Sequence, residues 1–239
     1  MDDDRRKNVL AEAMRLMNAG DSRKAAEFVI NAAPPVEAAG LFLDLAKEWY
    51  WKEKDLPMVI LASQAGIHFS LQKVMEEPNT DTARALREKA MSLSYNLASF
   101  AWPGWDDPLI VTTDTTNHIA LDAAYLHVRL ATGLGVDAEK MSAARWLVGA
   151  AHMALEEYDT AREAFELARE AASEARSAVF EDMNSGYMAI AEVMDGDAGG
   201  QGRFDEAVAR LRGRGDADST FFADQLVGVL AYFHKNTAS

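Results

Sequence analysis

Helix-breaking residues are few in this chain, and they cut it into segments of helical length. Only 6 of its 239 residues are proline and 15 are glycine. The segments between the breakers are rich in alanine, leucine, methionine and glutamate, which favour the α-helix over other conformations. Breakers and capping residues together predict about eleven helices, the first over 5–18 and the last over 217–235.

Consecutive helices of this length pair naturally into hairpins. The pairing predicts an all-α fold, an α-α superhelix (solenoid) of about five helical hairpins plus a C-terminal capping helix, 217–235. We expect one helical-repeat domain over 1–239. Its middle hairpin, 81–134, is irregular because a long loop, 102–113, interrupts it, and within this loop only 109–113 has a trace of strand pattern. No breaker separates the eighth helix from the ninth, so that boundary is inferred.

The composition excludes several classes of protein. A formal net charge of −14 argues against nucleic-acid partners and against adhesion to anionic membranes, and it fits a cytosolic protein or one with a basic partner. The chain has no cysteine, which excludes disulfides and thiolate chemistry. Residues 1–6 are charged rather than apolar, unlike a signal peptide, and the most apolar segment, 226–233, is too short to span a bilayer. We therefore expect a cytoplasmic, acidic protein.

One predicted helix pair has a specific spacing of small and aromatic residues. Gly149 lies where two helices must approach closely, and Phe165 is placed to fill the gap between them. Ala161 and Ala168 lie on the same face of the second helix as Phe165, and Tyr158 occupies the turn. This spacing resembles that of the tetratricopeptide-repeat family.

The resemblance covers one hairpin well and two others in part. In the best hairpin, Trp146 falls one residue from the family's tryptophan position, His152 replaces a tyrosine, and no proline closes the unit. The weaker repetitions of the second-helix pattern are Ala25, Val29, Ala32 and then Phe204, Ala207, Leu211.

The resemblance implies a non-catalytic scaffold that binds a protein or peptide. Family members usually hold the ligand in a concave groove lined by the first helix of each hairpin. Carried over to this sequence, the partner-binding residues are Trp51, Trp146, Met153, Phe180, Met183 and Tyr187, and Met14, Met17 and Ala150 line the same groove. An apolar, methionine-rich surface of this kind adapts to partner side chains. The alternative is that these side chains pack between hairpins.

A second candidate site is the irregular loop. Two indoles, Trp102 and Trp105, stand beside Asp106 and Asp107, and long loops in compact domains often have a function. The alternative function is therefore an enzyme or small-molecule-binding protein with a pocket near Trp102–Trp105. The structural alternative is a loop folded back as a lid over apolar surface.

No motif in the sequence predicts catalysis, a cofactor or a metal. The five histidines form no pair at metal-binding spacing, and no catalytic serine motif appears. Residues 195–206 resemble a calcium loop, but Gly199 replaces an oxygen ligand and Arg203 adds positive charge. We expect a turn there and a protein that is not an enzyme.

The last helix is apolar almost all round, from Phe221 to Phe233. A terminal cap should present a polar face to water. Two explanations remain open: the helix is buried by folding back on its own chain, or it forms a homodimer contact through Phe221–Phe233.

Overall fold

The computed structural model describes residues 1–78 and 80–237. Eleven α-helices account for the regular structure of this part of the chain, and it contains no strand, which confirms the predicted all-α fold. The helices are α1 (Asp3–Asn18), α2 (Ser22–Ala32), α3 (Pro35–Glu48), α4 (Leu56–Glu76), α5 (Asp81–Phe100), α6 (Asp114–Leu134), α7 (Ala138–Ala154), α8 (Tyr158–Glu174), α9 (Ala178–Met194), α10 (Gly200–Arg214) and α11 (Ala217–Thr237). A π-helical turn, η1 (Trp49–Glu53), follows α3, and a 3-10 turn, η2 (Pro103–Trp105), follows α5.

The chain forms two compact units. Unit 1 comprises 1–101 and 109–111, and unit 2 comprises 102–108 and the described residues from 112 onward. The two helices of the expected middle hairpin, 81–134, therefore belong to different units, α5 to unit 1 and α6 to unit 2.

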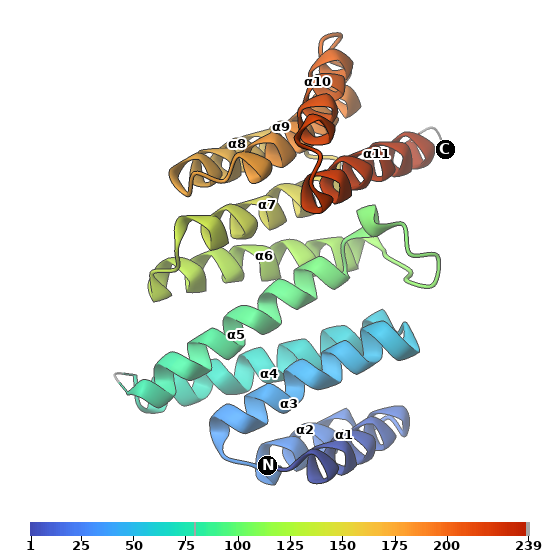
Figure 1. Ribbon diagram of the computed structural model, residues 1–239. Helices are drawn as coiled ribbons and strands as arrows, with labels where there is room; N and C mark the ends of the chain where they lie inside the picture. The colour runs from blue at the N-terminus through green and yellow to red at the C-terminus, as the bar shows by residue number, and fades with distance from the viewer. Residues whose placement is uncertain (79, 238–239) are drawn as a thin grey trace. The chain divides into compact units, whose positions relative to one another are not determined.

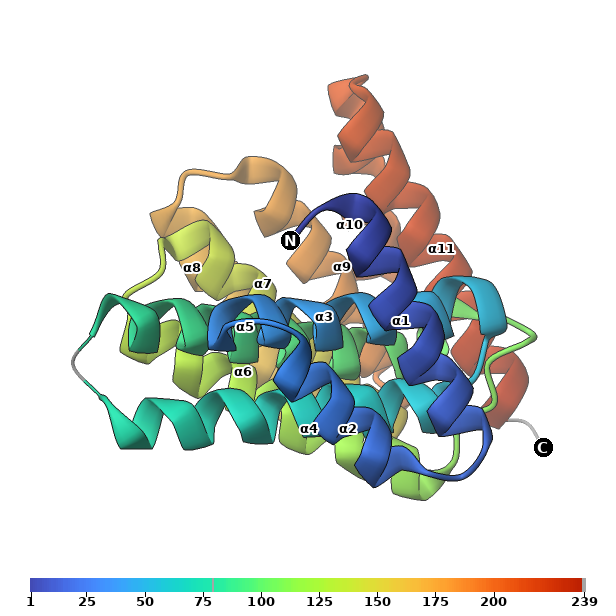
Figure 2. The same ribbon diagram turned by 90° about the horizontal axis from the view of Figure 1, so that it is seen from below.

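Unit 1 contains α1 to α5, each packed on the next. The chain runs out along α4 and returns along α5, so these two helices lie side by side in opposite directions (Figure 1, Figure 2). Local capping sets where they begin: the Asp55 carboxylate accepts the Met58 backbone N–H at α4, and the Thr80 hydroxyl accepts the Ala83 N–H at α5.

Unit 2 contains α6 to α11, again packed in sequence, with α11 lying against both α9 and α10. The predicted close approach at Gly149 is confirmed, since a Cβ there would lie 2.5 Å from a ring carbon of the fully buried Phe165. Gly186 has the same role in α9, where a Cβ would lie 2.3 Å from Leu226 of α11. Glycine is therefore required at both positions, where α7 crosses α8 and where α9 crosses α11.

The inferred boundary between α8 and α9 is formed without glycine or proline. Arg176 adopts a left-handed conformation (φ 56°) and donates its backbone N–H to Ser173, while Ser177 donates to Ala172. These bonds close the end of α8 as a glycine usually does.

Candidate functional site

Most of the predicted partner-binding residues are buried inside unit 2. Trp146, Met183 and Tyr187 are at most 7% exposed, and Met153 is fully buried. Trp102 packs against two of them, its ring centroid lying 5.5 Å from that of Trp146 and 6.1 Å from that of Tyr187. In this structure these four residues therefore do not line an accessible groove, because they are packed inside the chain.

The Trp102–Trp105 loop is a packed lid. Trp102 is 3% exposed and stacks edge to face on the half-buried Trp105 at 4.7 Å, and it also contacts the ring of Phe233 in α11 at 6.5 Å. Gly104 permits this arrangement, because a Cβ there would lie 2.4 Å from the Trp102 ring. The loop therefore resembles a lid folded back over apolar surface more closely than it resembles the wall of a ligand pocket.

The two aspartates that follow η2 lie nearer the surface than Trp102. Asp106 is exposed and left-handed (φ 50°), and Asp107 is half-buried. Burial, and secondarily the charge of Asp106, raises the pKa of Tyr232. The two carboxylates are therefore placed at the edge of the lid, outside the aromatic cluster.

Two predicted partner-binding residues keep accessible surface. Trp51 is 62% exposed on η1, where its ring meets that of Tyr50 edge to face at 4.8 Å and the Lys54 ammonium lies 5.3 Å from the Trp51 ring centroid. Phe180 is half-buried and packs edge to face on Phe222 of α11 at 5.6 Å. Trp51 therefore remains a candidate contact residue of unit 1.

The last helix divides its apolar residues between two faces. Leu226, Val229 and Phe233 are buried within unit 2, whereas Phe221 and Val227 are 62% and 42% exposed. Folding back explains the first set. The second set is two exposed apolar side chains that do not share one face of the helix, and the dimer hypothesis remains a prediction.

Unit 2 has an open groove on a different face, above α9 and between α8 and α10; we call it the α8–α10 groove. It consists of two adjoining hollows that share Glu166, Met188 and Glu192. The hollow of about 510 Å³ is lined by α8 and α9, and the hollow of about 260 Å³ is lined by α8, α9 and α10. The remaining lining residues are Arg162, Glu163, Leu167, Arg169, Ser185, Arg203, Glu206 and Arg210. Met188 and the 46% exposed Leu167 supply its apolar surface.

Charged pairs hold the walls of the groove. The Arg169 guanidinium donates to Glu166 within α8, and this hydrogen bond lowers the pKa of the Glu166 carboxyl. Arg203 of α10 donates to Glu192 of α9 at 2.5 Å, which links one wall to the floor. The Glu166 carboxylate therefore stays ionised at neutral pH.

Asp182 fastens α10 to α9 beneath the groove. It accepts hydrogen bonds from Arg210 at 2.6 Å and from Arg214 at 2.5 Å, and its own side chain is 11% exposed.

Replacing Asp182 with asparagine is expected to lower the free energy of unfolding by about 1–3 kcal/mol, because two charge-assisted hydrogen bonds weaken. Urea unfolding followed by circular dichroism measures this. Asp122→Asn, at an exposed position, should change stability little, and an equal effect of both changes would contradict the assigned role.

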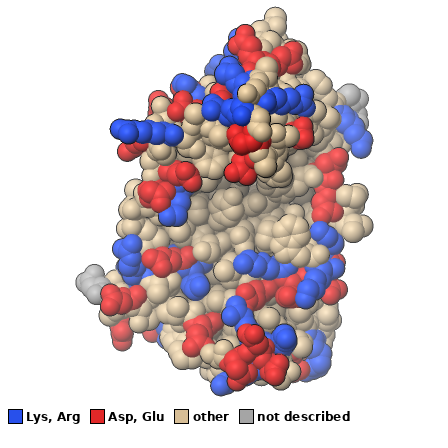
Figure 3. All heavy atoms as spheres, viewed as in Figure 1, with Lys and Arg blue, Asp and Glu red and all other residues tan. Residues whose placement is uncertain are grey.

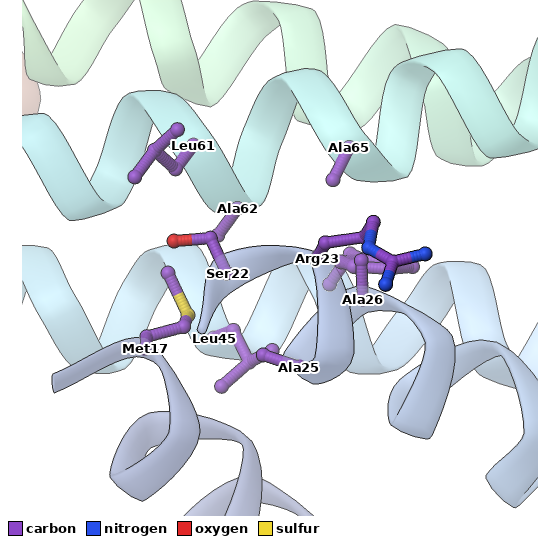
Figure 4. Close-up of a pocket in the computed structure, with 10 residues that line it drawn as sticks. Met17, Ser22, Arg23, Ala25, Ala26, Leu45, Leu61, Ala62 and Ala65 are labelled. Atoms are coloured by element: carbon purple, nitrogen blue, oxygen red, sulfur yellow. The ribbon is translucent and has the colours of Figure 1, made fainter. Parts of the chain in front are cut away.

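Unit 1 has a smaller apolar hollow of about 250 Å³ between α2 and α4 (Figure 4). Met17, Leu45 and Phe42 form its buried base, while Leu61 of α4 and Arg23 of α2 stand at its rim. Met17 therefore lies at the base of a hollow between second helices, which is a different place from the first-helix groove expected for it.

The two openings occupy corresponding places in their hairpins. Each lies between the second helices of consecutive hairpins, α2 and α4 or α8 and α10, over an intervening first helix, α3 or α9. Leu61 and Ala65 of α4 line one with the same four-residue spacing as Glu163 and Leu167 of α8 in the other. The sequence analysis did not predict these two openings, because it placed the groove on the first helix of each hairpin. The feature of the sequence that indicates them is the presence of apolar residues at exposed positions of the second helices.

On the face shown in Figure 3, acidic and basic side chains are interspersed rather than segregated. Among residues 1–78 and 80–237, no cluster of three histidine or carboxylate side chains is arranged to hold a metal ion. In the calcium-like loop, Asp197 instead accepts the Gly199 backbone N–H at 2.6 Å and pairs with Arg203. None of the described helices is both long and apolar enough to cross a membrane.

Comparison with known proteins does not assign this chain to a family. No protein-family model matches the chain, and no curated protein matches it.

Proposed function

We propose that this protein is a non-catalytic, cytoplasmic scaffold that binds a peptide segment of a partner protein in the α8–α10 groove. The observation that carries the proposal is the pair of adjoining hollows that share Met188 on α9. Together they make an opening larger than a single side chain fills, with apolar surface at its centre and hydrogen-bonding groups along its sides. Such a site fits an extended or helical peptide, because alternate side chains can reach the floor and the walls.

The second candidate function, a small-molecule or catalytic pocket near Trp102–Trp105, has less support. Trp102 occupies the space that a ligand would need, and its ring contacts Trp146 and Tyr187 directly. The α8–α10 groove, in contrast, is open without any rearrangement of the chain.

Replacing Met188 with aspartate is expected to weaken peptide binding at least tenfold. The change places a charge where both hollows meet, and leaving a charged group against an apolar ligand surface costs several times RT. The probe is a phage-displayed library of random 16-residue peptides selected on the full chain, with enriched peptides remeasured by fluorescence polarisation.

Met75→Asp is the matched control, because Met75 is 75% exposed on α4 in unit 1. Circular dichroism must show that both variants fold. The proposal is supported if selected peptides bind the wild type and the Met75 variant alike and bind the Met188 variant more weakly. It fails if selection enriches nothing, or if the enriched peptides do not distinguish Met188→Asp from wild type.

A further inference from the structure

We propose that the segment bound in the α8–α10 groove is a basic amphipathic peptide, with leucine-like side chains on the floor and lysine or arginine side chains directed at the walls. This inference rests on the proposed function and adds the chemistry of the partner.

The arginines that line the groove are already neutralised. Arg162 pairs with Asp159 at 3.1 Å, and Arg169 pairs with Glu166 at 2.5 Å. Arg203 is shared between two carboxylates, Glu192 at 2.5 Å and Asp197 at 2.9 Å. Arg210 pairs with Asp182 at 2.6 Å. An acidic peptide would therefore have to displace a carboxylate of the chain at every cation it approached.

Two glutamates of the groove lack such partners. Glu163 on α8 and Glu206 on α10 are exposed, and neither forms an ion pair or hydrogen bond within the part of the chain that the structure describes. They stand on opposite flanking helices, with Met188 of α9 between those helices. The groove thus offers an apolar centre with one unpaired negative charge on either wall.

Negative charge also predominates in the chain as a whole, whose formal net charge is −14. A cationic peptide is attracted at long range by this field and is then held by the two unpaired carboxylates at short range. Partly exposed pairs contribute modestly, so we expect the two glutamates together to strengthen binding roughly tenfold at low salt.

The test uses three synthetic amphipathic peptides with identical leucine positions and with lysine, glutamine or glutamate at all polar positions. Fluorescence polarisation with the full chain measures each affinity at about 50 and about 300 mM salt, where screening differs strongly. We expect the lysine peptide to bind roughly tenfold more tightly than the glutamine peptide at low salt, and the glutamate peptide to bind most weakly.

A double variant, Glu163→Gln with Glu206→Gln, should remove most of the preference for lysine. Its control, Glu139→Gln with Glu174→Gln, makes the same change in net charge at exposed positions outside the groove and should leave the preference intact. A lysine preference that both double variants reduce equally overturns the inference, because it then arises from net charge alone.

The outcomes separate this inference from the proposed function. If the lysine and glutamine peptides bind equally and Met188→Asp weakens both, the groove binds peptides but the inference about charge is wrong. If Met188→Asp leaves the binding of every peptide unchanged, or if no peptide binds, both proposals fail.

Discussion

Replacing Gly149 with valine is expected to lower the free energy of unfolding of unit 2 by about 3 kcal/mol. A Cβ at this position would lie 2.5 Å from the Phe165 ring, a distance that real Cβ contacts do not show. The ring cannot move aside, because Phe165 is fully buried and stacks on Tyr187 at 5.2 Å between centroids. The two helices must therefore separate, and packing between α7 and α8 is lost.

Hydrogen exchange followed by mass spectrometry places this effect in the chain. We expect faster exchange in α7, α8 and α9, with α3 and α4 unchanged, since those helices belong to unit 1. Gly133→Val is the control: a Cβ at Gly133 in α6 meets nothing within 4 Å, and valine has a better helix propensity than glycine. A Gly149 variant as stable as the Gly133 variant would contradict the close approach of α7 and α8.

The helices and this crossing could be predicted from sequence because both depend on local rules. Breakers, caps and helix-favouring residues locate the segments, and the Gly149–Phe165 spacing predicts the crossing. The end of α8 could not be placed firmly because Arg176, an ordinary residue, takes the left-handed conformation that glycine usually takes. A left-handed cap formed by a residue other than glycine leaves no mark in residue type.

The candidate site was harder to predict than the fold. The periodicity of Phe180, Met183 and Tyr187 predicts one face of α9, but periodicity does not distinguish a face covered by the same chain from one that binds a partner. Trp102, distant in sequence, packs against Trp146 and Tyr187. The unpaired state of Glu163 and Glu206 could not be predicted either, because a sequence rich in charge does not show which carboxylates form an ion pair.

Replacing Trp102 with alanine is expected to lower the free energy of unfolding of unit 2 by about 3–5 kcal/mol, the range for large buried aromatic residues. The indole is 3% exposed, and its ring contacts those of Trp105, Trp146, Tyr187 and Phe233. Its removal leaves a cavity where η2, α7, α9 and α11 meet. Urea unfolding followed by far-ultraviolet circular dichroism measures the loss, and hydrogen exchange should locate it in α7, α9 and α11.

Trp51→Ala makes the same chemical change at a side chain that is 62% exposed and is expected to lower stability by only about 1 kcal/mol, through the loss of its contacts with Tyr50 and Lys54. The pair of variants therefore separates a structural indole from a surface indole. If Trp102→Ala were as stable as Trp51→Ala, the Trp102–Trp105 loop would not be needed for folding, and the buried face of α7 and α9 could open to a ligand. A large loss confined to unit 2 would instead mean that this face is sealed by the chain itself, so that a partner must bind elsewhere, as the open α8–α10 groove allows.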